Sequence, residues 1–124
     1  MRALAVRAFF MLIFFHIYLA RGSFSALQDK VRRFPISHGT RSQFAIDDVC
    51  RDIDLACIWY PKEVLCLQRS AATACLLKRY GFSAQLVVGA RLMPFKAHAW
   101  VEVNGRVIND KPYIPEMYAV LDRC

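Results

Sequence analysis

Apolar side chains recur along this chain with two different periods, and the change of period separates a helical first part from a stranded second part. Over residues 45–59 they return every three or four positions, as in a helix with one buried face. Residues 66–80 show the same period, with Lys78 and Arg79 at the end and Gly81 beyond, which is typical of a helix C-terminus. A shorter helix is expected over residues 27–34, ended by Pro35, followed by a polar loop over residues 36–43.

Three strands are expected after these helices. Residues 84–89 form a mostly apolar run ending at a glycine, and residues 97–103 and 106–110 flank the turn pair Asn104-Gly105. The residues after Pro112 are expected to form a short tail. Helices followed by a small antiparallel sheet predict the α+β class, and 124 residues suffice for one domain but not for two.

The turn at Asn104-Gly105 allows two registers for the hairpin that contains His98. A plain two-residue turn places His98 opposite Lys111. A three-residue loop, in which Gly105 is the left-handed residue of a bulge, places His98 opposite Asp110. The choice matters because a slip of one residue moves every side chain to the other face of the sheet.

Cross-strand pairs favour the bulged register. It sets Glu102 opposite Arg106, which pairs opposite charges, and Trp100 opposite Ile108, which pairs an aromatic ring with a β-branched side chain. The plain turn would set Glu102 opposite Val107. We therefore expect the bulged hairpin.

The first twenty residues are a basic lead followed by an apolar run, residues 8–20, interrupted only by His16. As a helix this run would be ~20 Å long, too short for the ~30 Å hydrocarbon core of a membrane. The segment has the form of a secretory signal, with Ser23-Phe24-Ser25 as a cleavage site. The alternative is a retained helix that packs on the domain or lies on a membrane surface. The segment alone does not decide between them.

The formal charge of +7 raises the question of a nucleic-acid partner. The basic residues are scattered, however, and no nucleic-acid-binding motif accompanies them, so we expect no such partner. The five cysteines include no C-x-x-C spacing, which argues against a disulfide framework and a zinc knuckle and fits a reducing compartment.

Cys66 differs in position from the other cysteines. It is expected at the start of a helix, where unpaired N–H groups and the helix dipole stabilise an anion, so a thiolate nucleophile is favoured there. The same N–H groups can bind an oxyanion. The other four thiols are expected to be packing or idle residues: Cys50, Cys57, Cys75 and Cys124.

His98 and Asp110 complete a candidate catalytic set with Cys66. In the bulged register Asp110 hydrogen-bonds one ring nitrogen of His98 and leaves the other free to act as a base. The alternative is a histidine that merely packs on a half-buried strand.

These motifs, in the order Cys, His, Asp, resemble the transglutaminase-like branch of the papain-type fold, and more narrowly the B2 proteins of lasso-peptide biosynthesis. The resemblance covers about residues 45–121 and implies a protease domain over residues 45–124, after an apolar helix and basic linker over residues 1–44. It rests on Ile58-Trp59-Tyr60-Pro61, Cys66-Leu67-Gln68-Arg69-Ser70, Leu76-Leu77-Lys78-Arg79-Tyr80-Gly81, Val88-Gly89, Pro94-Phe95-Lys96-Ala97-His98-Ala99-Trp100-Val101-Glu102-Val103 and Asn109-Asp110.

The resemblance implies a leader peptidase with Cys66, His98 and Asp110 as its triad and no metal or organic cofactor. Its substrate would be a lasso precursor, cut at the leader–core junction. Its partners would be a leader-binding B1 protein and an asparagine-synthetase-like cyclase. The N–H of Leu67 and the side chain of Trp59 are candidate oxyanion donors, although a packing aromatic is the favoured interpretation of Trp59.

Because such precursors are processed before export, the resemblance favours a cytoplasmic protein that retains residues 1–20, in contact with the rest of the domain, a partner or the inner membrane face. Secretion is the disfavoured alternative. An amine acyltransferase (a transglutaminase) using the same triad, and a non-catalytic adaptor, are the rival functions.

Overall fold

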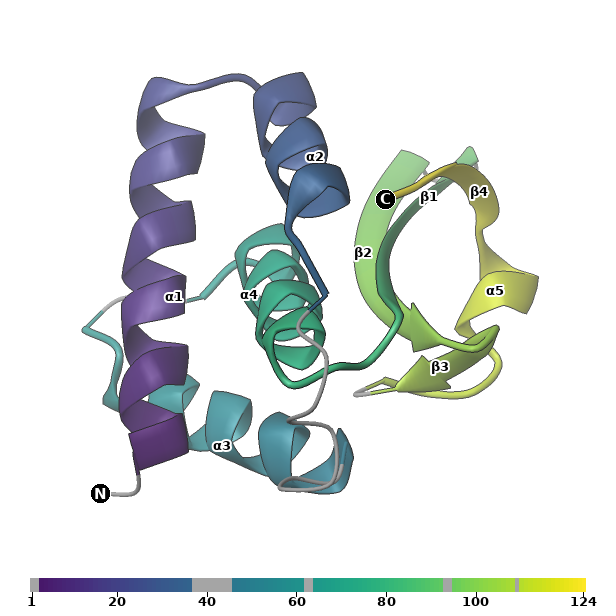
Figure 1. Ribbon diagram of the computed structural model, residues 1–124. Coiled ribbons are helices and arrows are strands. Elements are labelled where there is room, and N and C mark those ends of the chain that lie inside the picture. Colours follow the sequence, from purple (N-terminus) through teal and green to yellow (C-terminus); the bar gives the residue numbers. More distant parts are fainter. Residues whose placement is uncertain (1–2, 37–45, 62–63, 93–94, 109) are drawn as a thin grey trace.

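Helices fill the first part of the chain and a four-stranded antiparallel sheet the second, which confirms the α+β class (Figure 1). The computed structural model describes residues 3–36, 46–61, 64–92, 95–108 and 110–124. All but the first residue of the loop expected over residues 36–43 therefore lies outside the described residues, as do Pro94 and Asn109. The elements are α1 (Ala3–Arg21), α2 (Phe24–Arg33), α3 (Ile46–Trp59), α4 (Cys66–Arg79), β1 (Ala84–Leu92), β2 (Phe95–Val103), β3 (Arg106–Ile108), α5 (Ile114–Met117) and β4 (Ala119–Arg123).

Local signals in the sequence set the ends of the helices. Ser23 caps α2, its side chain accepting a hydrogen bond from the N–H of Ala26. The same helix ends at Phe34, whose backbone is extended because a proline follows it. Helix α4 ends at Tyr80, and Gly81 follows with a φ of 91°, a conformation that suits a residue without a Cβ.

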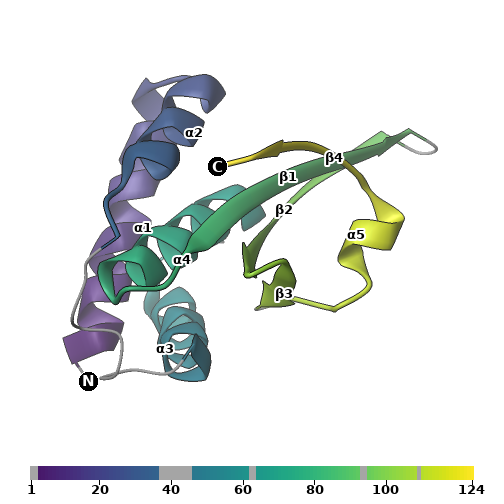
Figure 2. The ribbon, with the colours of Figure 1, turned by 45° about the vertical axis from the view of Figure 1, so that its right-hand side comes forward.

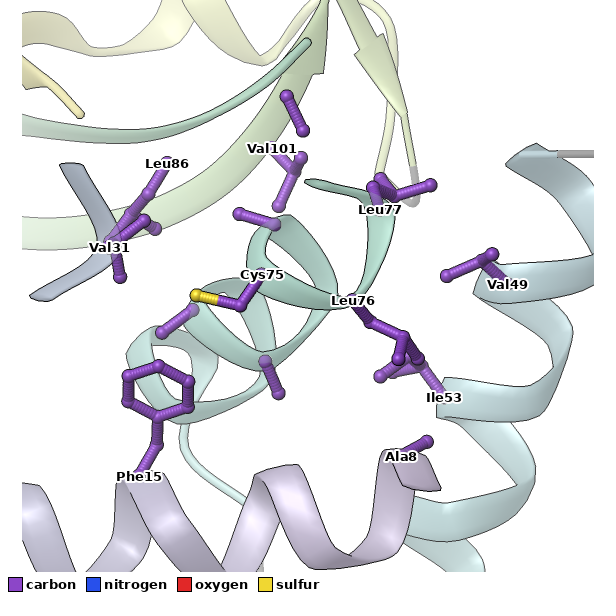
Figure 3. Close-up of a cluster of buried hydrophobic side chains, with 14 of the residues drawn as sticks. Ala8, Phe15, Val31, Val49, Ile53, Cys75, Leu76, Leu77, Leu86 and Val101 are labelled. Carbon is purple, nitrogen blue, oxygen red and sulfur yellow. The ribbon is translucent and has the colours of Figure 1, made fainter. Parts of the chain in front are cut away.

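Helix α4 lies at the centre of the main core, with α1, α2 and α3 on its sides and the sheet across it (Figures 1 and 3). Its residues from Ala71 to Leu77 are all fully buried. Figure 3 shows side chains from every surrounding element pointing at this helix, among them Phe15 of α1, Ile53 of α3 and Val101 of β2. The arrangement fixes the position of α4 from several directions, and with it the position of Cys66 at its start.

Helix α1 is built into this core on one side. Ala8, Leu12 and Phe15 are fully buried against α3 and α4. The buried amide of Gln68 on α4 donates a hydrogen bond to the carbonyl oxygen of Leu12, at 2.7 Å. Among the described residues, no helix is both long and apolar enough to cross a membrane.

The predicted register of the β2–β3 hairpin is wrong. The structure pairs Val103 with Arg106, Glu102 with Val107 and Val101 with Ile108, which is the plain two-residue turn. Asn104 and Gly105 both have positive φ, of 53° and 76°. This turn matches the twist of the strands without a bulge.

Burial decides this register, and the surface charge pair does not. Ile108 packs with Val101 toward α4, and Val107 packs on the opposite face with Trp100. The favoured pairing of Glu102 with Arg106 would contribute only ~0.2–1 kcal/mol, less than the side chains gain from burial on their correct faces. Glu102 is in fact buried, where it accepts a hydrogen bond from the Trp100 indole.

The residues expected to form a tail contain a helix and a strand. Strand β4 pairs antiparallel with β1, so the sheet order is β3-β2-β1-β4. A bulge between Val88 and Gly89 shifts the register of that pairing. Helix α5 lies on the side of the sheet that faces away from α4 (Figure 2) and supplies Ile114 to a second, smaller core with Val87, Trp100 and Tyr118.

Candidate active site

The candidate nucleophile stands at the start of α4. Cys66 is the first residue of that helix, and its side chain is exposed. The first intrahelical bond links the N–H of Arg69 to the carbonyl of Leu65, so the N–H groups of Cys66, Leu67 and Gln68 have no partner within the helix. This is the anion-stabilising position expected from the sequence.

The candidate base is held by a carboxylate. Nε2 of His98, on β2, lies 2.7 Å from Oδ2 of Asp110, and both side chains are about one quarter exposed, at 23% and 24%. The other oxygen of Asp110 accepts a hydrogen bond from the N–H of Lys111, which fixes the carboxylate. The pair is present although the expected register is wrong, because β3 ends at Ile108 and Asp110 lies beyond the paired residues.

An aromatic cluster surrounds the imidazole. The His98 ring stacks on Trp100 and on Tyr118, with ring centroids 6.0 and 5.5 Å apart. Across the sheet His98 is paired with Gly89 of β1. A Cβ at Gly89 would lie 2.8 Å from the Trp100 ring and 3.0 Å from Cβ of Tyr118, so glycine is required there for close packing.

The three candidate residues line one small hollow in the surface, with a volume of about 80 Å³. The residues around it come from α4, β2, β3 and the segment after β3. They are Cys66, Arg69, Ser70, His98, Ala99, Trp100, Val101, Ile108 and Asp110. The structure thus brings together residues 32 and 44 positions away from Cys66 in the chain.

A hydrogen bond joins the two elements that carry the thiol and the imidazole. Ser70 follows Cys66 by four positions on α4, and its hydroxyl donates to the carbonyl oxygen of Ala99, at 3.1 Å. Ala99 is next to His98 on β2. The bond is buried and holds α4 against β2 beside the hollow.

The two candidate oxyanion donors differ in position. Leu67 is the second residue of α4, and its N–H is one of the free groups at the helix start. Trp59 is the last residue of α3; its side chain is 66% exposed and is absent from the lining of the hollow. The structure does not bring Trp59 to the three candidate residues.

Sequence reasoning missed Ser70, Gly89 and Tyr118. The spacing of Ser70 from Cys66 is one helical turn, so the sequence contained a signal for it. Tyr118 reaches His98 only because β4 pairs with β1, and no local pattern predicts that contact. Gly89 marked the end of an apolar run and belonged to a motif of the resemblance, but neither signal gave its packing role.

Burial keeps the other thiols protonated. It raises the pKa of Cys50 and of Cys124 to about 11 and that of Cys75 to about 12, with nearby carboxylates Asp54 and Asp122 adding to the effect at the first two. Burial also raises the pKa of Cys57. These four thiols are therefore unsuited to nucleophilic attack near neutral pH.

Among the described residues, no group of three or more histidine, cysteine, aspartate or glutamate side chains is placed to hold a metal ion.

The fold and the matching family define the class of this protein. The family model of the transglutaminase-like superfamily matches residues 10–123, nearly the whole chain, and the protein belongs to that family. The match takes in most of α1, beyond the range in which the motifs carried the resemblance.

Part of the chain is also similar in sequence to one particular protein. The chain is 43% identical over 56 residues to the microcin J25-processing protein McjB of Escherichia coli, over 45% of this chain and 27% of the relative. The chain thus matches about a quarter of the length of that relative. No solved structure matches the chain. The resemblance inferred from the motifs is confirmed.

Proposed function

We propose that this protein is a cysteine peptidase that removes the leader peptide from a lasso precursor. The observation that carries the proposal is that Cys66, His98 and Asp110 line one hollow, with the His98 imidazole bonded to Asp110. The similarity to a microcin J25-processing protein supports the class of substrate. A leader-binding B1 protein and an asparagine-synthetase-like cyclase are the proposed partners.

The chemistry would be acyl transfer through the Cys66 thiol. The thiolate attacks the carbonyl carbon at the leader–core junction, and the oxyanion that forms is bound by the free N–H groups at the start of α4, that of Leu67 among them. Protonated His98 gives its proton to the departing amine of the core, which leaves an acyl-enzyme. Neutral His98 then takes a proton from water, which attacks and releases the leader as a carboxylic acid.

Asp110 would act by orienting the base. Its bond to Nε2 leaves Nδ1 of His98 as the nitrogen that exchanges a proton with the thiol and with the leaving amine. It also stabilises the imidazolium that forms after the thiol is deprotonated. Replacement by asparagine would keep the shape and lose that stabilisation.

The small volume of the hollow bears on how a substrate would bind. At about 80 Å³ it is much smaller than the pockets of ~300–1,000 Å³ that enclose small ligands. The precursor would therefore lie across the surface as an extended peptide, with its scissile bond over Cys66. Affinity for such a substrate would come largely from a partner that binds the leader.

The first prediction concerns the nucleophile. The Cys66→Ala variant should cleave a leader-bearing precursor at least about a thousandfold more slowly, because it lacks the thiol that forms the acyl-enzyme. Cys57→Ala is the matched control and should retain the rate, since that thiol has a raised pKa. Cleavage is measured by mass spectrometry, with and without the leader-binding partner; undiminished cleavage by Cys66→Ala would exclude Cys66 as the nucleophile.

The same measurement separates hydrolysis from transfer to an amine. Hydrolysis gives a free leader with a carboxylic acid at its end, whereas an amine acyltransferase gives the leader joined to the amine present. Only the second product has the summed mass of leader and amine less one water. That product would overturn the peptidase proposal and leave the triad assignment intact.

We also place this protein in the cytoplasm, since the leader would be removed before the product is exported. In that case residues 1–20 are retained. The mass of the protein isolated from its native host tests this, and loss of the residues before Ser23 would indicate secretion.

A further inference from the structure

The outer side of α1 carries an apolar surface that the protein leaves uncovered. Val6, Phe10, Phe14 and Ile17 recur at the spacing of one helix face, and Phe24, the first residue of α2, is a further exposed apolar side chain. We call these five residues the apolar stripe. All five are exposed; Phe10 is 63% and Ile17 50% exposed.

Helix α1 is thus apolar on both of its sides. The inner side, with Leu12 and Phe15, is fully buried in the core. The helix lies at the outer edge of the helical layer (Figures 1 and 2), and the described elements leave every side chain of the stripe at least 37% exposed. A helix that is apolar all round is normally buried all round, so the stripe needs an occupant from outside the described chain.

The segment of the chain that carries the stripe has more basic than acidic residues. Residues 1–36 contain six Lys and Arg and a single acidic residue, Asp29, which gives +5 of the chain's formal +7. Asp29 and Asp122 both form ion pairs with Arg32, at 3.2 and 2.9 Å, so the charge of Arg32 is compensated within the protein. Arg21, at the end of α1, is exposed on the same side as Ile17.

One cation is held directly over the stripe. Nζ of Lys30, on α2, lies 5.7 Å from the centre of the Phe14 ring. An ammonium group at that level would meet the phosphates of lipid headgroups while the aromatic rings enter the acyl boundary below them.

We infer that the apolar stripe docks on an anionic lipid surface, with α1 lying in the plane of the interface. The stripe from Val6 to Ile17 would span ~17 Å along the helix, which suits a helix lying on a membrane. The charge on the surrounding residues favours anionic lipid over a second copy of this equally basic chain.

Vesicle flotation tests the inference without reference to any peptidase activity. The whole chain should float with vesicles of phosphatidylcholine and phosphatidylglycerol in equal parts, and much less with phosphatidylcholine alone. Added salt should weaken the binding to the anionic vesicles, because the charges are then screened. A chain that floats with neither kind of vesicle contradicts the proposal.

Matched variants locate the surface. Phe10→Ser/Ile17→Ser should lower binding to the anionic vesicles at least about tenfold, since it removes two of the largest apolar contacts. Leu92→Ser/Leu121→Ser removes two side chains that are 80% and 67% exposed on the sheet and should bind as the parent does. Equal binding by all three proteins would show that the stripe is not the docking surface.

A variant that lacks one positive charge tests the electrostatic contribution to binding independently. Lys30→Gln should weaken binding to anionic vesicles and leave the weak binding to phosphatidylcholine unchanged. Urea unfolding midpoints should match the parent for every variant because the replaced side chains are exposed or half-exposed. If sedimentation instead shows a dimer that Phe10→Ser/Ile17→Ser dissociates, with no lipid bound, the occupant is a second copy and the lipid proposal is wrong.

Discussion

At the scale of single residues, the imidazole of His98 is placed by contacts that the hairpin alone does not supply. Asp110 bonds one ring nitrogen, and the Trp100 and Tyr118 rings stack on the imidazole. Trp100 is itself fixed, because its indole N–H donates to Glu102, whose other oxygen lies 3.5 Å from Nε of Arg123. The orientation of His98 thus depends on residues on or next to both edge strands of the sheet, β3 and β4.

The packing of Trp100 and Tyr118 around His98 depends directly on the absence of a side chain at Gly89. Replacement by alanine would put a methyl group 2.8 Å from the Trp100 ring, so the ring must move. We expect Gly89→Ala to lower the free energy of unfolding by about 1–3 kcal/mol. If His98 is the base, we also expect a lower rate of precursor cleavage at saturating substrate.

Urea denaturation and cleavage kinetics measure the two effects. Gln85→Ala, at an exposed position of the same strand, is the control and should change neither. Tyr118→Phe keeps the stacked ring and should retain the rate, whereas Tyr118→Leu should lower it. An alanine at position 89 without any loss of stability would contradict the packing described for Trp100.

At the scale of elements, burial explains which expectations were confirmed and which were wrong. The helix over residues 66–80 was expected within one residue of its observed end, because its apolar period and the following glycine are local signals. The register predicted for the β2–β3 hairpin is wrong, because burial of the correct face of the sheet outweighs the single cross-strand pairs on which the prediction rested. Strand β4 was missed, since five residues ending in Asp122 and Arg123 show no clear strand pattern.

Helix α1 offers a matched test of which side supports the fold. Phe15 is fully buried and Phe10 is 63% exposed on the same helix. Phe15→Ala should lower the free energy of unfolding by about 3–5 kcal/mol through lost burial and a cavity, whereas Phe10→Ala should change it by less than about 0.5 kcal/mol. Urea denaturation of both variants measures this, and equal losses would mean that α1 is not seated as described.

At the scale of the whole molecule, the fold places five thiols in different surroundings. Cys66 is exposed at a helix start, and the other four have pKa values raised by burial. The family match over residues 10–123 agrees with a core shared by α1 through α4 and the sheet. The division of the chain at residue 45 stays a prediction.

The expected difference in reactivity between Cys66 and the other thiols can be measured by alkylation. A thiol with a pKa of about 11 exists as thiolate to only ~0.1% at pH 8, so Cys50 and Cys124 should react with iodoacetamide at least about a hundredfold more slowly than Cys66. Raising the pH toward 11 should narrow the difference, since the thiolate form of Cys50 and Cys124 then becomes populated. Peptide mapping identifies the modified residue.

Unfolding the protein provides the control for that experiment. In concentrated urea the five thiols share one environment, so their rates should agree within a few-fold. If Cys75 reacted as fast as Cys66 in the folded protein, the central position of α4 would be contradicted.

The sequence by itself determined the helices that precede the sheet, the α+β class, the family and the three candidate catalytic residues. These follow from apolar period, helix-end signals and motifs, all of which are local in the chain. Only the tertiary structure decided the hairpin register, the place of β4 and the stacking of Tyr118 on His98. Each of these depends on which apolar faces are buried together, and burial is a property of contacts between segments distant in the chain.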